Sequence, residues 1–201
     1  DLAIGLRELA ARLRMLGRLP DNLPQSLDSS GDFAVKDFHF PNGCHICEIE
    51  VDPETGVIKI DRYAVVADFG VIINPMIVRG QLHGGVAQGL GQALFEHCVY
   101  DERGQLMTGS FMDYAMPRAF DFPEPKATFH EVPSTANPLG VKGCGEAGAT
   151  GSIPAISNAV ADALARAGVA IKIDMPFTPE KMWRAFNLPK ETIKSHNRAA
   201  P

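Results

Sequence analysis

The sequence lacks the features of membrane-spanning, nucleic-acid-binding and disulfide-rich proteins. No apolar run approaches the roughly 20 residues that a membrane helix needs, and no signal peptide opens the chain as given. The net charge is −5, and no cluster of Lys and Arg suggests contact with nucleic acid. Four irregularly spaced cysteines in 201 residues form no disulfide framework. We therefore expect a globular protein with a sizeable core, no nucleic-acid partner and no membrane span, cytoplasmic by default.

The segment from Cys44 to Cys47 contains His45 and follows His39, so it has some of the residues of a metal site. A structural zinc site needs a second ligand pair, and the chain has none at suitable spacing. Strand alternation also points Cys44 and Cys47 to opposite faces. We interpret these thiols as small packed side chains and predict no metal ligands.

The hydrophobic pattern predicts a mixed α/β (α+β) fold without internal repeats. Helical spacing occurs in four segments, 1–17, 77–97, 152–168 and 178–186. Alternation predicts strands at 44–51, 57–67 and 126–132, with shorter ones near 99–100 and 106–110. Turn residues at 52–56 and 101–104 predict hairpins. We predict a helix and linker at 1–31, one domain at 32–188 and a flexible tail at 189–201.

Local signals add detail to the last two helices. Ser152 is predicted to cap the third helix, and Pro154 to lie in its first turn. The buried stripe of that helix would consist of Ile156, Val160 and Leu164, and Gly168 would end it. In the last helix Thr178 is expected to act as the cap and Trp183 to pack inward.

The predicted helix 77–97 carries an unusual number of glycines. Gly80, Gly84, Ala87 and Gly91 share one face, although each glycine costs about 1 kcal/mol relative to alanine in a helix. Close approach of a backbone or a bulky ligand would explain this stripe. Gln81 is placed in the first turn, where N-terminal amides attract anions. Close helix packing with glutamines at its edge is the alternative.

One ionisable residue, Glu146, lies in a dense group of glycines just before a predicted helix. Glycine allows a backbone to approach a ligand closely, so we interpret this loop as a site built around the carboxylate. Residues 143–148 formally match the dinucleotide motif G-x-G-x-x-G, but Pro133 and Pro138 interrupt the strand that must precede it. A phosphate-binding loop is excluded because Ala149 stands where lysine is required.

Five ordered motifs make residues 40–186 resemble the molybdopterin-binding large subunit of the xanthine dehydrogenase and aldehyde oxidase family, most closely its carbon-monoxide-dehydrogenase-like branch. They are Asn42-Gly43-Cys44-His45 with Glu48 to Gly56, Asp68-Phe69-Gly70 to Asn74-Pro75, Gly80-Gln81-Leu82-His83-Gly84-Gly85 to Gly89, Gly109 to Arg118, and Asn137-Pro138-Leu139-Gly140-Val141-Lys142-Gly143-Cys144-Gly145-Glu146-Ala147-Gly148. Members of the family are much longer, and the chain resembles their C-terminal portion.

The resemblance implies a molybdenum hydroxylase that inserts oxygen from water into an aldehyde, an N-heterocycle or a similar carbon. Glu146 would be the general base, in a dry loop that shields its carboxylate. Gln81 and the backbone of Lys142, Gly143, Cys144 and Gly145 would bind molybdopterin, in its cytosine dinucleotide form, with molybdenum. The Lys142 side chain could equally be a surface charge, while His83, Asp113 and Arg118 would be structural hydrogen-bonding residues.

The resemblance also implies partners. These are the remainder of the large subunit, an iron–sulfur subunit with 2Fe-2S clusters, an FAD subunit and a small-molecule substrate. Two clusters need eight thiolates, which four scattered cysteines cannot supply, so the clusters and FAD are expected on partner chains or domains. Some relatives are exported folded, which leaves a periplasmic location open. The alternatives are a noncatalytic scaffold or degenerate homologue, and a nucleotide-binding module using residues 143–148.

Overall fold

The computed structural model describes residues 3–17, 19–23, 25–28, 30–34 and 37–187. The chain divides into two units, residues 1–36 and 37–201. In the first unit, α1 (Leu6–Leu16) confirms the first predicted helix and buries none of its side chains. The domain bounds drawn from the sequence stay a prediction, and the tail predicted at 189–201 lies outside the described residues. Among the described residues, no helix is long and apolar enough to cross a membrane.

The second unit is built on a three-stranded sheet of order β1-β2-β3. β1 (Asn42–Val51) and β2 (Ile58–Asp68) form the predicted antiparallel hairpin, and β3 (Lys126–Phe129) pairs with β2 in parallel. β3 is shorter than predicted. The short strands predicted near 99–110 are reduced to one bridge, between Tyr100 and Leu106.

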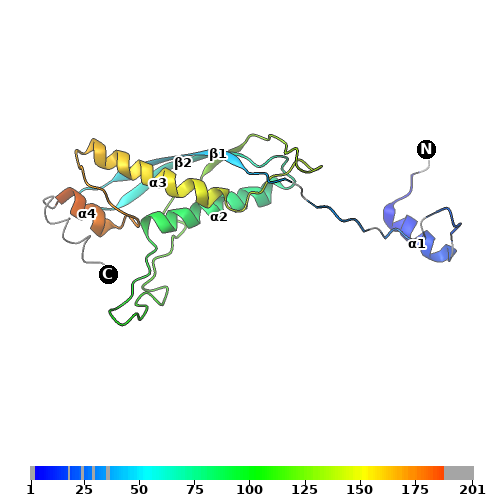
Figure 1. Cartoon of the computed structure of the whole chain (residues 1–201), viewed down its shortest axis with the longest axis horizontal. Helices are drawn as coiled ribbons and strands as arrows, with labels where there is room; N and C mark the ends of the chain where they lie inside the picture. The colour runs from blue at the N-terminus through cyan, green and yellow to red at the C-terminus, as the bar shows by residue number, and fades with distance from the viewer. Residues whose placement is uncertain (1–2, 18, 24, 29, 35–36, 188–201) are drawn as a thin grey trace. The chain divides into compact units, whose positions relative to one another are not determined.

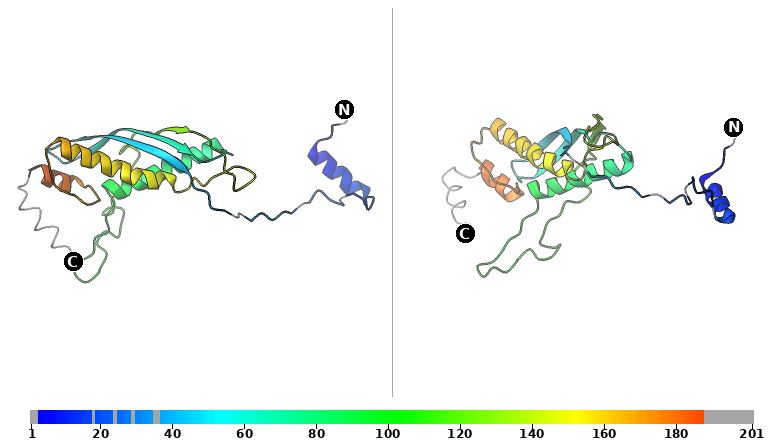
Figure 2. Two further views of the ribbon diagram at one scale, coloured as in Figure 1. Left: turned by 45° about the horizontal axis from the view of Figure 1, so that its top comes forward. Right: turned by 45° about the vertical axis from the view of Figure 1, so that its right-hand side comes forward.

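Two long helices, α2 (Pro75–Leu94) and α3 (Ala147–Arg166), lie side by side along the sheet (Figures 1 and 2). Alternate residues of β2 and one stripe of each helix form a single hydrophobic core, which includes Tyr63, Val65, Leu82, Val86, Leu90, Ile156, Val160 and Leu164. The predicted stripe of α3 is therefore confirmed. The opposite face of the sheet is open in this chain, since Ile46 and Val66 are exposed.

Both long helices begin earlier than predicted. The Asn74 side chain accepts hydrogen bonds from the N–H groups of Met76 and Ile77, so Asn74 and Pro75 start α2 instead of forming a separate turn. α3 starts at Ala147, which places Pro154 inside the helix. Ser152 is buried and donates to the Ala149 carbonyl, so it does not cap the helix.

The glycines that allow close helix packing are not the predicted stripe. Gly80 and Gly84 face open space. Gly91 lies against the side chains of Glu96 and Pro117, which belong to the segment after α2 and not to α3. Instead, Gly85 meets Gly148 of α3, where a Cβ on Gly85 would lie 2.8 Å from the Gly148 Cα atom. A Cβ on Gly89 would overlap the Ser152 hydroxyl. Small residues at i and i+4 on both helices therefore bring the two backbones together.

The last helix, α4 (Pro179–Asn187), confirms the prediction for this segment. The Thr178 hydroxyl accepts from the Lys181 N–H at 3.4 Å. The prediction that Trp183 packs inward is wrong, because its exposed fraction is 40%. Met182 and Ala185 occupy the core instead.

Candidate functional site

The loop that carries Glu146 is held at its start by the end of β2. Gly70 and Val141 form an antiparallel bridge, and the Lys142 N–H donates to the Phe69 carbonyl at 2.9 Å. The Asn137 side chain bonds both backbone groups of Val141, at 2.9 and 3.1 Å. The start of the loop is therefore held in place by backbone hydrogen bonds of the kind that pair neighbouring strands.

A buried ion pair reinforces this attachment. The Lys142 ammonium lies 2.5 Å from Asp68 Oδ2, and the two side chains are only 11% and 12% exposed. The other Asp68 oxygen accepts from the N–H groups of Gly70 and Val132, at 2.8 and 3.0 Å. Burial opposes ionisation of Asp68, but the hydrogen bonds and the Lys142 charge outweigh it and lower the pKa of Asp68 to about 2. The Lys142 side chain is thus neither a surface charge nor free to reach a cofactor.

Beyond Lys142, residues 143–145 present a backbone without partners. The N–H groups of Gly143, Cys144 and Gly145 donate no hydrogen bond within the described part of the chain. α3 begins directly afterwards, with Glu146 at its N-cap position and no side-chain cap. Free amides beside the start of a 20-residue helix form an electropositive concavity.

The fold brings Gln81 to this loop. A Cβ built on Gly145 would lie 3.9 Å from Gln81 Nε2, although the two residues are 64 positions apart. Gln81 itself is exposed. However, α2 starts at Pro75, so Gln81 is the seventh residue of the helix and the prediction of a first-turn position is wrong. Its side-chain amide, and not the helix N-terminus, is what it offers a ligand.

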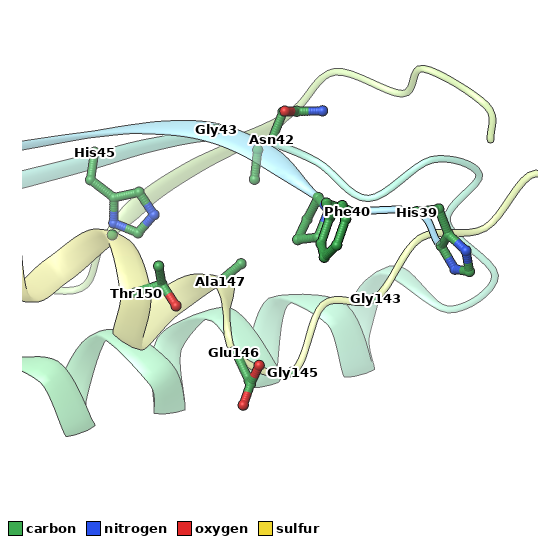
Figure 3. A pocket seen from close by; sticks show the side chains of 13 residues that line it. His39, Phe40, Asn42, Gly43, His45, Gly143, Gly145, Glu146, Ala147 and Thr150 are labelled. Carbon is green, nitrogen blue, oxygen red and sulfur yellow. The ribbon is translucent and has the colours of Figure 1, made fainter. Parts of the chain in front are cut away.

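Glu146 is exposed, and its carboxylate has no hydrogen bond or ion pair among the described residues. The expectation of a dry, shielding loop is therefore wrong for this chain, because the glycines on both sides have no side chains with which to cover it. Figure 3 shows the Glu146 side chain projecting from the side of the loop opposite Phe40 and His45.

A pocket of about 500 Å³ lies between residues 39–45 and the loop. Its lining includes Phe40, His45, Gly143 and Gly145 (Figure 3). His45 Nδ1 is hydrogen bonded to the Tyr63 hydroxyl at 2.9 Å, and burial lowers the pKa of His45 and raises that of Tyr63. Sequence reasoning missed this pair, although strand alternation already turns His45 inward.

The cysteine and histidine segment is arranged as a strand. Cys44 is exposed, contrary to its interpretation as a packed thiol, whereas Cys47 is half-buried and burial raises its pKa to about 11. The predicted orientation to opposite faces is confirmed. No group of three or more potential metal ligands occurs among the described residues. The buried Nε2 atom of His83 has no hydrogen-bond partner among the described residues, and its expected structural role stays a prediction.

Comparison with known proteins gives consistent matches. A family model described as a molybdopterin cofactor-binding domain matches residues 10–123. The nicotine 6-hydroxylase large subunit of Paenarthrobacter nicotinovorans is 46% identical over 146 residues, which are 73% of this chain and 18% of that protein. The carbon monoxide dehydrogenase large chain of Hydrogenophaga pseudoflava is 34% identical over 180 residues, covering 90% of this chain and 21% of the relative.

A solved structure of Cu,Mo-CO dehydrogenase in its carbon monoxide reduced state matches with a TM-score of 0.78 and 34% identity. The match covers 88% of this chain and 22% of that one. This likeness confirms the predicted mixed α/β fold class. The chain spans about a fifth of the length of these relatives.

Proposed function

This chain belongs to the molybdopterin cofactor-binding domain family, and we propose that it forms part of a molybdenum hydroxylase in which Glu146 is the general base. Membership of the family confirms the resemblance that the sequence motifs indicated. Because the chain spans only about a fifth of its relatives, the activity, substrate and partners of the complete protein are proposed on the same basis.

The observation that carries the proposal is the set of unpaired groups around residues 143–146. Three N–H groups without partners among the described residues directly precede α3, and the Gln81 amide lies close to Gly145. As hydrogen-bond donors beside a helix start, they favour an anionic ligand. Molybdopterin is such a ligand, so the donors present fit the cofactor. Gln81 and the backbone of Gly143, Cys144 and Gly145 would hold it. The Lys142 side chain is committed to Asp68 and its N–H to the Phe69 carbonyl, so Lys142 would contribute to cofactor binding only through its backbone carbonyl.

When bound, the cofactor would supply the two-electron acceptor for the hydride that leaves as the C–H bond of the substrate carbon breaks. Glu146 would accept the proton of the water-derived nucleophile on a carboxylate oxygen while that nucleophile attacks the carbon. Both oxygens are available, because neither has a partner among the described residues. Catalysis of this kind gains from the exclusion of bulk water. Since Glu146 is exposed here, we propose that the substrate and the remainder of the protein cover it.

The substrate class is an aldehyde, an N-heterocycle or a similar oxidisable carbon centre. Electrons would leave through 2Fe-2S clusters and FAD on partner chains or domains, because the four free cysteines of this chain cannot ligate two clusters. We propose the cytosine dinucleotide form of the cofactor on the resemblance alone.

The test is Glu146→Gln in the complete enzyme. This substitution keeps the size of the side chain and removes its basicity, so turnover per molybdenum should fall by about 10²- to 10⁴-fold, with molybdenum content unchanged. Glu180→Gln is the matched control, because Glu180 is exposed and its one ion pair with a described residue is with Arg184, at 2.7 Å. Its turnover should equal that of the parent.

Parental turnover in Glu146→Gln at full molybdenum content would refute the base assignment. Gln81→Ala tests the cofactor assignment separately, and it should lower molybdopterin content in the purified enzyme. If the intact parental assembly holds no molybdenum, the noncatalytic scaffold becomes the better hypothesis.

A further inference from the structure

Asp68 joins three segments that are distant in sequence. It ends β2, its Oδ1 atom accepts from Val132 in the segment after β3, and its Oδ2 atom meets Lys142 at the start of the Glu146 loop. The partners are 64 and 74 residues away. One buried carboxylate therefore ties the loop to the sheet through side chains, in addition to the backbone pairing of Val141 and Lys142.

The loop itself has little to hold it in place. Residues 143–145 donate no backbone hydrogen bonds among the described residues, and two of the three are glycines with wide conformational freedom. Their placement must therefore be imposed from the two ends. Lys142 holds one end, through its backbone bond to Phe69 and its side-chain pair with Asp68. Gly148 holds the other end, packed against Gly85 of α2. Only residues 143–147 lie between these fixed points.

A buried ion pair is suited to this role because it tolerates little displacement. Each charge lies in a site with little access to water, so separation of the pair leaves both charges poorly solvated. Exposed pairs of the chain, such as Asp162 with Arg166, lack this property because water screens them.

We propose that Asp68 and Lys142 are positioning residues for Glu146. The inference rests on the proposed role of Glu146 as the base and adds to it the residues that set its location. Loss of the pair leaves the Lys142 ammonium buried without a counter-charge, so its side chain must move against the backbone bonds that still hold Val141 and Lys142. This movement displaces the loop that follows, and the carboxylate no longer lies where proton transfer needs it. A displacement of about 1 Å is enough to lower a catalytic rate by about 10²-fold.

The test combines Asp68→Asn with Glu146→Gln in the complete enzyme. Asparagine retains an oxygen for the N–H groups of Gly70 and Val132 and places an NH2 group where Oδ2 meets Lys142, so Lys142 loses both its counter-charge and its hydrogen-bond acceptor. The rate of substrate-driven reduction in a single turnover, per molybdenum, should fall by about 10- to 100-fold in the parental background, with little change in KM. In the Glu146→Gln background the same substitution should change the rate less than about threefold, because the group it positions is already inactive.

An equal fall in both backgrounds, or no fall in either, overturns the positioning role. Parental turnover in Glu146→Gln alone overturns the proposed function instead, so the two failures are distinguishable. Asp162→Asn, which breaks an exposed pair 2.7 Å long on α3, is the matched control and should leave the rate unchanged. If Asp68→Asn accumulates without molybdenum, the double variant Asp68→Asn with Lys142→Met, which leaves no unpaired charge, replaces it with the same expected pattern.

Discussion

Alanine at Gly85 should destabilise the fold, whereas alanine at its neighbour Gly84 should stabilise it. Both residues lie inside α2, so both substitutions gain about 0.5–1 kcal/mol of helix propensity. The two positions differ in their surroundings. Gly84 faces open space, while a Cβ on Gly85 would lie 2.8 Å from the Gly148 Cα atom and 2.9 Å from the Ala149 nitrogen.

The cost at Gly85 follows from these distances. Carbon atoms pack at about 3.5–4.0 Å, so alanine would force α2 and α3 apart by at least roughly 0.7 Å. Overpacking of this kind costs about 1–3 kcal/mol, and the upper end applies because the obstructing atoms are backbone and cannot rotate away. After the gain in propensity, Gly85→Ala should lower the free energy of unfolding by about 2 kcal/mol.

Urea denaturation of the two variants and the parent measures both effects in one experiment. The propensity gain is common to both substitutions, so the difference between them isolates the packing cost. If Gly85→Ala is as stable as Gly84→Ala, the two helices are not in backbone contact. In that case the contact between Gly85 and Gly148 does not hold the start of α3, and it does not set the position of Glu146.

Further predictions concern the turns, the ion pair and the last helix. Gly104→Ala should lower the free energy of unfolding by about 1–2 kcal/mol, because Gly104 has a positive φ of 80° and no other obstacle to a side chain. Gly56→Ala should lower it further, because Gly56 has a φ of 74° and a Cβ there also overlaps the α4 backbone. Urea denaturation of the two variants measures the difference. The pKa of Asp68 is lowered from 3.8 to about 2. The ionised Asp68 carboxylate therefore stabilises the folded state above pH about 4, and this contribution is lost as the pH falls toward about 2. Between pH about 4 and about 2 the free energy of unfolding of Asp68→Asn should depend less on pH than that of the parent. Met182→Ala should lower the free energy of unfolding by about 2–5 kcal/mol, and Trp183→Ala by less, because Met182 is fully buried and Trp183 is 40% exposed.

Sequence periodicity was sufficient to predict the four helices and the three main strands of the described residues, but it placed the starts of the two long helices too late and predicted short strands near residues 99–110 that form only one bridge. The β1–β2 hairpin follows from alternation around a turn that needs glycine at position 56, and the buried stripe of α3 follows from helical spacing. The helix starts were misplaced because the signals there are ambiguous. Asn74-Pro75 is typical of a turn as well as of a helix start, and Pro154 suggests a first turn although it lies inside α3.

The face on which the helix glycines pack was predicted wrongly for a different reason. α2 contains two possible small-residue stripes, and helical spacing fits both. The choice between Gly84 and Gly85 depends on where α3 lies, which is a tertiary property. Trp183 shows the same limit, because α4 has more than one apolar residue able to enter the core, and Met182 is the one that is fully buried.

At the site, the residues of the local motif were predictable and the residues that support them were not. Glycine density and the family resemblance identified Glu146, residues 142–145 and Gln81, and the fold places Gln81 beside Gly145. Their binding and catalytic roles stay a prediction. The Asp68–Lys142 pair spans 74 residues and leaves no local pattern in the sequence. Its members meet through tertiary contacts, which include the bridge at Val141 and the Lys142 N–H bond to the Phe69 carbonyl.

The position of Glu146 therefore depends on both ends of its loop, and each end can be displaced by a different substitution. Gly85→Ala displaces the end at α3 and also loosens the core, so it should lower both stability and turnover. Asp68→Asn displaces the end at the sheet, where the charge it removes is the partner of Lys142. If the position of Glu146 is what limits the rate, the two substitutions together should reduce turnover by less than the product of their separate effects, because a carboxylate already displaced from one end has less to lose from the other. Independent, multiplying effects would instead show that the two ends act on different parts of the site.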